Sequence, residues 1–157
     1  MLIQQATKDD VVQISEIYKA CFPREKDHLK WIQACFNSYP KGVYYTLTED
    51  EKVIGYILWC VKNGFRDKTI VELEQVGVLP NYAGRGFGKA LVKESFSKFR
   101  VFVESLGFGL GAVVVTTSEG NYAEQMYRSV LGVEVSSRIC NYGSGNELIL
   151  YKNYDES

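Results

Sequence analysis

The chain has 157 residues, of which 46% are hydrophobic and 24% charged, and its 18 basic and 19 acidic side chains give a net charge of -1. This length is that of one domain, which buries about 70% of its unfolded surface and needs no disulfide or metal to hold a core. The balanced charge excludes the strongly basic proteins that bind nucleic acids through a charged face. We therefore expect a single domain over residues 1–157 and no nucleic-acid partner.

The cysteines and the one histidine give no metal-binding pattern. Cys21, Cys35, Cys60 and Cys140 form no CxxC pair, and His28 lies in no Cys/His cluster, so we expect no metal. No apolar run approaches the roughly 20 residues of a membrane span, and the first residues do not resemble a signal peptide. We predict a cytoplasmic protein with reduced thiols and no membrane contact.

The N-terminal half predicts a strand, two helices and two strands. In chain order these are residues 3–6, 7–21, 27–36, 42–48 and 53–61. Thr7, with Asp10 three residues later, is typical of a helix start. In the second helix Trp31 and Cys35 fall on one stripe. The last two segments are rich in Val, Ile, Tyr and Trp and are joined by a polar turn, which favours a hairpin.

The C-terminal half predicts a strand, a long helix, a strand, a short helix and a final hairpin. In chain order these are residues 69–78, 88–106, 112–117, 121–130, 133–140 and 147–152. The long helix carries Val92, Phe96, Phe99 and Val103 at intervals of four, three and four, which places them on one face. The strand that follows it is an uninterrupted apolar run and suits a buried central position. The hairpin turns across residues 142–146.

Residues 73–91 are the most informative stretch, because they combine a strand, a glycine loop and a helix start. Gly84, Gly86 and Gly88 leave the backbone unshielded by side chains. Amides that open a helix point their N–H groups, with the positive end of the helix dipole, at whatever lies in front of them. This pattern predicts an anion site that suits a phosphate; the alternative is a glycine-rich turn that only joins strand to helix.

Spacing excludes two common phosphate loops. A Walker loop ending in Gly88-Lys89 requires glycine at position 83 and Ser or Thr at position 90, where Ala83 and Ala90 stand. A GxGxxG dinucleotide loop that starts at Gly84 requires glycine at position 89, which is Lys89. The loop is therefore of a different kind.

The loop resembles the acyl-CoA pyrophosphate loop of the GCN5-related N-acetyltransferases (GNAT), whose pattern is Gln/Arg-x-x-Gly-x-Gly/Ala. The chain reads Ala83-Gly84-Arg85-Gly86-Phe87-Gly88, so Ala83 replaces the first Gln or Arg and the backbone amides are kept. The order of predicted elements also resembles the family over essentially the whole chain. The resemblance implies a mixed α/β (α+β) fold with a mostly antiparallel sheet of six to seven strands, about four flanking helices, and a splayed strand pair that admits acetyl-CoA.

The resemblance also assigns residues to acetyl-CoA as co-substrate. They are Val76, Gly77, Val78, Gly84, Arg85, Gly86, Phe87, Gly88, Lys89, Ala90 and Asn121. A backbone N–H near Val76 is expected to polarise the thioester carbonyl. Arg85 or Lys89 either adds charge at the phosphates or is a solvated cation. Asn121 either hydrogen-bonds the pantetheine arm or caps the next helix.

Tyr127 is the predicted general acid. The segment from Asn121 to Tyr127, followed by Leu131-Gly132-Val133, resembles the family segment in which a helix tyrosine meets the coenzyme sulfur. A phenol, with a reference pKa of about 10, can protonate a thiolate that develops in a dry site. The alternative is that Tyr127 is only a core residue of an amphipathic helix.

Glu74 is the predicted general base, with Glu72 as second candidate. The two lie two residues apart in a strand and so share one face with Val76 and Val78. A carboxylate with a reference pKa of about 4.3 deprotonates an alkylammonium only if burial raises that pKa or if water relays the proton. The alternative for both, and especially for Glu72, is to bind the positive substrate or to form an ion pair at the sheet edge.

The acceptor is the least defined part of the prediction. The resemblance places acceptor choice in the first two helices, the loop between them and the final hairpin, where aromatic residues line either a pocket or the core: Phe22, Trp31, Tyr39, Tyr44, Tyr45 and Tyr142. We predict an acetyl-CoA-dependent N-acetyltransferase that acts on a primary amine of a small molecule. The alternatives are a protein N-terminus or lysine as acceptor, and a regulatory acyl-CoA-binding module without turnover. The final hairpin either adds strands across a homodimer or serves one core.

Overall fold

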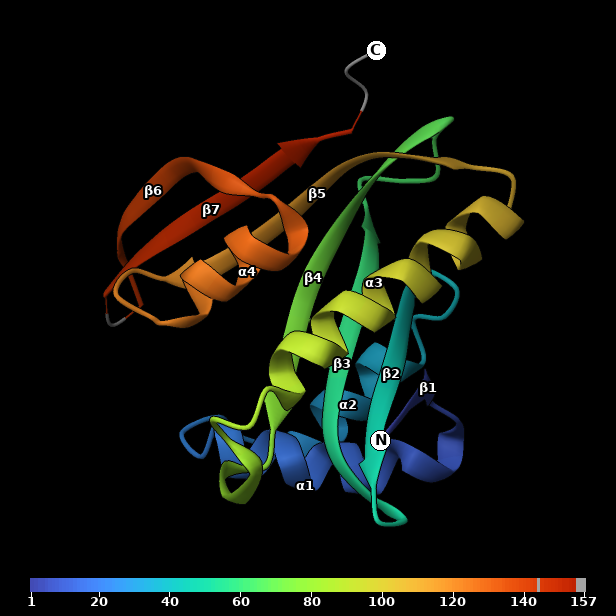
Figure 1. Ribbon diagram of the computed structural model, residues 1–157, viewed down its shortest axis with the longest axis vertical. Coiled ribbons are helices and arrows are strands. Elements are labelled where there is room, and N and C mark those ends of the chain that lie inside the picture. The colour runs from blue at the N-terminus through green and yellow to red at the C-terminus, as the bar shows by residue number, and fades with distance from the viewer. Residues whose placement is uncertain (144, 155–157) are drawn as a thin grey trace. The chain divides into compact units, whose positions relative to one another are not determined.

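The computed structural model of the chain describes residues 1–143 and 145–154. In this part, seven strands form one sheet in the order β1-β2-β3-β4-β5-β7-β6 (Figure 1). The strands are β1 (Leu2–Gln5), β2 (Gly42–Glu49), β3 (Lys52–Lys62), β4 (Lys68–Val78), β5 (Gly109–Ser118), β6 (Glu134–Tyr142) and β7 (Gly145–Asn153). The α-helices are α1 (Val11–Cys21), α2 (His28–Phe36), α3 (Phe87–Ser105) and α4 (Ala123–Leu131). The predicted fold class is confirmed, and no helix among these residues has the length and apolar character needed to cross a membrane.

The chain divides into two compact units. The first contains Met1–Cys60 and Gln75–Phe99, and the second contains Val61–Glu74 and Arg100–Ser157. Three elements, β3, β4 and α3, run from one unit into the other along the chain.

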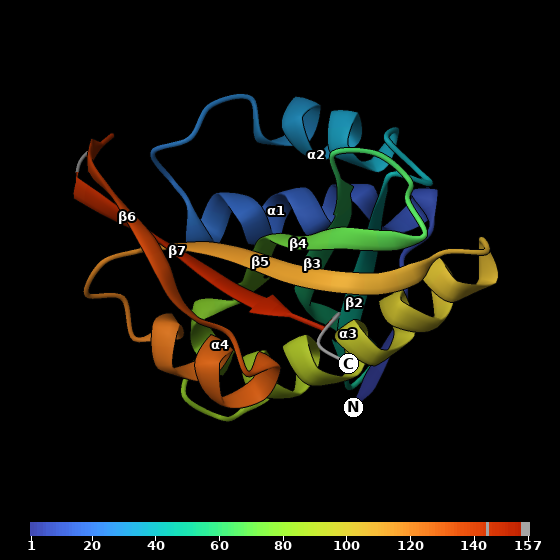
Figure 2. The ribbon, with the colours of Figure 1, turned by 90° about the horizontal axis from the view of Figure 1, so that it is seen from above.

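Helices α1 and α2 of the first unit lie on one side of β2 and β3 (Figure 2). A short 3-10 turn (Lys8–Asp10) precedes α1, and the Thr7 backbone N–H donates to the Asp10 carboxylate at 2.8 Å, as expected for the predicted helix start. The buried residues between the helices and the strands form one apolar cluster, which includes Val11, Ile14, Ile17, Ile32, Tyr44, Tyr56 and Leu58. This cluster fixes both helices on the sheet.

The predicted stripe of α2 is wrong for Trp31. Its side chain is 46% exposed, whereas the neighbouring Ile32 is fully buried. Cys35 and Phe36 also pack against the apolar cluster. They follow Ile32 by three and four residues, which is the spacing of one helix face. The stripe therefore begins at Ile32, and Trp31 points to solvent.

The opposite face of β3 packs on α3. The buried Trp59 indole N–H donates to the Ser95 hydroxyl at 2.8 Å. The Trp59 ring lies 5.3 Å from the Phe96 ring and 6.0 Å from the Phe99 ring, centroid to centroid. Fully burying a side chain such as Phe99 contributes roughly 2 kcal/mol. The predicted apolar face of α3 is confirmed, since Val92 and Phe99 are also fully buried.

Strand β5 is the central strand of the second unit. It pairs in parallel with β4 from Lys68↔Gly109 to Leu73↔Val115, and antiparallel with β7. Val113 and Val115 are fully buried, which confirms the predicted central position. Figure 2 shows α4 beside β5 and β7. Strands β6 and β7 form the predicted hairpin; its predicted turn includes residue 144, which lies outside the described residues.

Candidate active site

The glycine loop of the first unit turns the chain into α3. Gly84 has φ of 74° and Gly86 has φ of 82°, both in the left-handed region that favours glycine. A Cβ built at either position meets no atom within 4 Å. Both glycines are therefore required by the turn of the backbone and not by crowding.

The start of α3 presents unused backbone donors. The Ala90 N–H donates to the Gly86 carbonyl at 3.1 Å and makes the first helical hydrogen bond. Among the described residues, the N–H groups of residues 84–89 donate to no acceptor. The helix behind them has 19 residues, so its dipole adds positive potential at these groups. This is the geometry that an anion-binding helix start requires.

Arg85 lies against a pair of aromatic rings. Its guanidinium carbon lies 5.3 Å from the ring centroid of Tyr82 and 5.3 Å from that of Phe87, and the two centroids are 6.0 Å apart. Cation–π contacts of this kind favour one position of an exposed side chain. Arg85 thus adds a positive charge to the loop that carries the unused N–H groups. Sequence reasoning named Arg85 but not the ring pair, which the two aromatic residues flanking the loop could have indicated.

Gly77 is a glycine for reasons of packing. A Cβ built there lies 2.8 Å from the Tyr56 ring and 3.2 Å from Cys21 Sγ. The Cys21 thiol donates to the Val78 carbonyl at 3.3 Å. Burial raises the pKa of the Tyr56 hydroxyl, which finds no hydrogen-bond partner in the described part of the chain. A glycine inside a strand often marks such a close approach, although the sequence did not identify the neighbour.

A second group of polar contacts surrounds Gln75. The Tyr44 hydroxyl donates to Gln75 Oε1 at 3.0 Å, and Gln75 Nε2 donates to Cys35 Sγ at 3.4 Å. The sequence did not indicate Gln75, because a single polar residue within a strand forms no recognisable pattern.

The aromatic residues predicted to line either an acceptor pocket or the core separate into two groups. Tyr44 and Tyr45 are buried, whereas the other four are exposed: Phe22, Trp31, Tyr39 and Tyr142.

Glu72 and Glu74 of the second unit lie on one face of β4. Val71 and Leu73 are buried, and the two glutamates alternate with them at half-buried and exposed positions. The Glu72 carboxylate lies 3.2 Å from Lys62 Nζ in an ion pair. This contact matches the structural alternative for Glu72. Glu74 directly follows Leu73, the last β4 residue in the ladder with β5.

Tyr127 lies on the buried face of α4. It is 6% exposed. Burial raises the pKa of its phenol to about 12, with a smaller contribution from Tyr122. Its hydroxyl makes no hydrogen bond to the residues that the structure describes. Tyr127 is therefore a neutral phenol with an unused donor, as a general acid must be.

Asn121 caps α4. Its Oδ1 accepts a hydrogen bond from the Ala123 N–H at 3.0 Å. This contact favours the capping alternative over a role toward pantetheine. The helix ends at Leu131, and Gly132 follows with φ of 71°. The cap and the left-handed glycine set the limits of the helix that carries Tyr127.

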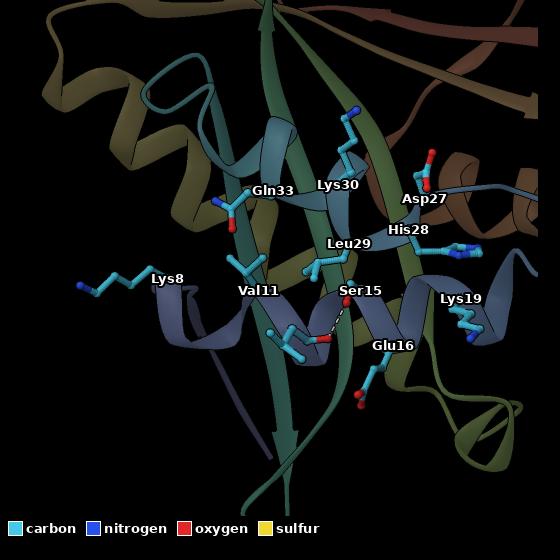
Figure 3. Close-up of a pocket in the computed structure, with 11 residues that line it drawn as sticks. Lys8, Val11, Ser15, Glu16, Lys19, Asp27, His28, Leu29, Lys30 and Gln33 are labelled. Atoms are coloured by element: carbon cyan, nitrogen blue, oxygen red, sulfur yellow. Dashed lines mark hydrogen bonds between the residues drawn. The ribbon is translucent and has the colours of Figure 1, made fainter.

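A groove of about 760 Å³ lies between α1 and α2 of the first unit (Figure 3). Its walls carry side chains of both charges, among them Lys8, Glu16, Lys19, Asp27 and Lys30. None of the predicted site residues lines it. The mixed charge favours no ionic ligand class.

The predicted site residues fall into two groups. The first unit holds Val76 to Val78 and the loop residues up to Ala90; the second holds Glu72, Glu74, Asn121 and Tyr127. Among the described residues no group of three or more His, Cys, Asp and Glu side chains could hold a metal ion. The unused donors of the first unit suit an anionic ligand.

The comparison with known families decides the class. The sequence model of the Acetyltransferase (GNAT) family matches residues 11–133. The chain belongs to the GNAT family. It is thus an acetyl-CoA-dependent acetyltransferase, and the predicted resemblance of the chain to this family is confirmed.

Solved structures share the fold at low sequence identity. The aminoglycoside 6'-N-acetyltransferase from Enterococcus faecium is 14% identical, with a TM-score of 0.78 over 100% of this chain and 99% of that chain. A ribosomal-protein-alanine N-acetyltransferase from Brucella melitensis is 19% identical, with a TM-score of 0.76 over 98% and 99%. NAA60 from Arabidopsis thaliana, solved with acetyl-CoA, is 16% identical, with a TM-score of 0.76 over 99% of both chains. No curated protein matches the sequence.

Proposed function

We propose that this GNAT protein transfers the acetyl group of acetyl-CoA to a primary amine of a small molecule by direct attack. The observation that carries the proposal is the start of α3, where the N–H groups of residues 84–89 face no acceptor among the described residues. A pyrophosphate supplies the anionic oxygens that such donors bind. The left-handed turns at Gly84 and Gly86 expose these donors.

The proposed coenzyme residues are those implied by the resemblance. They are the β4 backbone at Val76, Gly77 and Val78, the loop and helix start from Gly84 to Ala90, and Asn121. Arg85 adds a positive charge, and its guanidinium lies 5.3 Å from the ring centroids of Tyr82 and Phe87. Lys89 is exposed in the first turn of α3 and adds a second positive charge. For Asn121 the observed cap is the stronger role.

In the proposed reaction, the neutral amine forms a C–N bond with the thioester carbonyl carbon and the C–S bond breaks. Tyr127 gives its phenolic proton to the departing sulfur, which leaves as the thiol. Glu74 accepts the proton that the amine nitrogen loses, directly or through water. A backbone N–H near Val76 stabilises the negative charge on the carbonyl oxygen.

Glu74 is preferred to Glu72 as the base. The Glu72 carboxylate pairs with Lys62 Nζ at 3.2 Å, a contact that matches a structural role. Glu74 follows the last paired residue of the β4–β5 ladder, where the family has a splayed strand pair. We assign Glu72 to an ion pair between β3 and β4 and not to proton transfer.

A small-molecule amine is our preferred acceptor. Phe22, Trp31 and Tyr39, around α2, are exposed aromatic residues that can contact such a molecule. A protein N-terminus or lysine is the second candidate, since a ribosomal-protein-alanine N-acetyltransferase shares the fold. A third candidate, of another class, is an acyl-CoA-binding regulator without turnover.

We also propose that the two units act as one cytoplasmic domain, since the residues matched by the family model belong to both units.

The test is acetyl transfer from acetyl-CoA over a panel of aminoglycosides, polyamines, amino acids, and peptides with a free N-terminus or lysine. The products are identified by mass spectrometry. Acetylation of a small amine in preference to every peptide supports the proposal. Preference for a peptide would replace it with the second candidate, and tight acetyl-CoA binding without any product would replace it with the regulator.

A further inference from the structure

The C-terminal part of β4 has a strand partner on one side. Among the described residues, its ladder with β5 ends where Leu73 lies opposite Val115. On the side of β3, the Leu79 N–H just after the strand donates to the Ile54 carbonyl at 2.8 Å. A strand paired on one side has fewer backbone hydrogen bonds, so its side-chain contacts matter more for its position.

The Val76 N–H points away from β3. Along an extended strand, successive N–H groups point alternately to its two edges. Leu79 donates to β3, so the N–H three residues earlier, at Val76, faces the other edge. The Gly77 carbonyl agrees with this alternation, since it lies 3.3 Å from a Cβ built at Gly55 of β3. The Val76 N–H belongs to the peptide group that joins Gln75 to Val76, so a contact that holds Gln75 also orients this planar group.

Gln75 is half-buried, and both ends of its side-chain amide make hydrogen bonds. Its Oε1 accepts from the Tyr44 hydroxyl at 3.0 Å, and its Nε2 donates to Cys35 Sγ at 3.4 Å. Hydrogen bonds away from water are electrostatically stronger than those in solvent, because the local dielectric is lower. The two bonds therefore favour one orientation of the amide, with its oxygen toward β2 and its nitrogen toward α2.

Both partners of Gln75 are themselves held by packing. Tyr44 is 2% exposed, and its backbone carbonyl accepts from the Ala6 N–H at 2.8 Å. Its ring lies 6.0 Å from the Tyr56 ring, centroid to centroid. Cys35 packs against the apolar cluster that fixes α1 and α2. Gln75 thus ties β4 to β2 and α2 through contacts within the first unit.

We propose that Gln75 is a positioning residue for acetyl transfer, because its amide fixes the peptide group that carries the Val76 N–H. The proposal rests on the proposed function, in which this N–H stabilises the negative charge on the carbonyl oxygen. Such a donor is effective when it is in place before the charge develops. A misplacement of about 1 Å can cost about 100-fold in rate. Gln75 acts here through the backbone and touches neither the acetyl group nor the amine.

Steady-state kinetics of Gln75→Met test this role, because methionine keeps the length of the side chain and makes neither hydrogen bond. We expect kcat to fall about tenfold. The KM for acetyl-CoA should stay within about twofold, since the N–H groups at the start of α3 are unchanged. Tyr44→Phe removes one of the two bonds and should lower kcat about threefold to tenfold. The double variant should match Gln75→Met, because both changes break the same contact.

Tyr18→Phe is the matched control. Tyr18 belongs to the same apolar cluster and is 8% exposed, but the hydrogen-bond partners of Gln75 are Tyr44 and Cys35. Loss of the Tyr18 hydroxyl should leave kcat unchanged, and circular dichroism at the assay temperature shows that each variant is folded. A wild-type kcat in Gln75→Met would overturn the proposal. A change confined to the KM for acetyl-CoA, or losses that multiply in the double variant, would also overturn it.

The backbone amide resonance of Val76 separates this proposal from the proposed function. In isotope-labelled protein, Tyr44→Phe should shift this resonance although the two residues lie far apart in the chain, and Tyr18→Phe should not. An unmoved Val76 resonance in Tyr44→Phe would overturn the positioning role. A shifted resonance in a protein that acetylates no amine would overturn the proposed function and leave the hold of Gln75 on this peptide group in place.

Discussion

At the scale of single residues, Tyr127 combines a buried ring with an unused hydroxyl. A hydroxyl without an acceptor in the described part of the chain can donate to a ligand sulfur. The ring is buried in the second unit, so a packing role and the proposed catalytic role are compatible.

Tyr127→Phe should lower kcat by about 100-fold or more, because it removes the proton donor and keeps the ring. The KM for acetyl-CoA should change little. The control is Tyr122→Phe, on an 85% exposed neighbour, which should behave as the wild type. Steady-state kinetics of both variants check this, and equal kcat values for wild type and Tyr127→Phe would contradict the assignment.

The pH dependence follows from the direction of the Tyr127 shift. Burial raises the pKa of this phenol to about 12. The proton-donating form is thus fully present below about pH 11 and is lost only as the pH rises through that pKa. The kcat profile from about pH 7 to pH 10 should therefore show no decline caused by Tyr127. A decline in that range that disappears in Tyr127→Phe would show that the phenol ionises earlier than its burial predicts.

The two glutamates of β4 should differ in their effect. Glu74→Gln should lower kcat/KM by about 100-fold, because the amide accepts no proton from the amine. Glu72→Gln breaks the partly exposed ion pair with Lys62, so its main cost is stability, about 1 kcal/mol or less. Kinetics and urea unfolding of both variants separate these effects. A larger kinetic loss in Glu72→Gln would exchange the two roles.

At the scale of elements, we propose that the glycine loop and the start of α3 bind the pyrophosphate together. Gly86 allows the left-handed turn, and the first helical hydrogen bond is made only at Ala90. Arg85, which lies against the rings of Tyr82 and Phe87, adds a positive charge. In this proposal the backbone N–H groups bind the anion, and side chains contribute only in part.

Gly86→Ala should weaken acetyl-CoA binding. A Cβ in the left-handed region costs roughly 1 to 2 kcal/mol, so the loop relaxes from the conformation that presents its donors. The KM for acetyl-CoA should rise about fivefold to thirtyfold. Gly64→Ala is the control, since Gly64 also has a positive φ, of 101°, and an open surrounding, but lies in another loop. Equal KM values for the two variants would contradict the role of the loop.

The positions of helices and strands were largely predictable from the sequence, because the spacing of apolar residues and the residues that cap helices are local properties. The apolar spacing in α3 located its buried face, and Thr7 with Asp10 marked the first helix. The error in α2 arose because Trp31 and Ile32 are both apolar, and only packing on the strands selects Ile32. The start of α4 at Ala123 and not at Asn121 follows from the Asn121 cap.

At the scale of the molecule, the glycine loop was enough to predict the family. The residues that contact each candidate site residue could not be predicted from the sequence. Three contacts join residues whose separation along the chain is not that of a helix or strand face. They are the ion pair of Glu72 with Lys62, the rings beside Arg85, and the approach of Tyr56 to Gly77. No periodicity encodes such contacts. They depend on strand order and side-chain direction, which only the folded chain supplies.

The most direct test of acetyl transfer to an amine is the stoichiometry of the reaction. Purified protein is mixed with acetyl-CoA and the best acceptor of the panel, and free thiol and acetylated amine are measured together over time. We predict equal amounts of thiol and acetylamine, both dependent on the amine and both slowed in Tyr127→Phe. Saturable acetyl-CoA binding with no thiol release for any acceptor would contradict catalysis and assign the protein to the acyl-CoA-binding regulators.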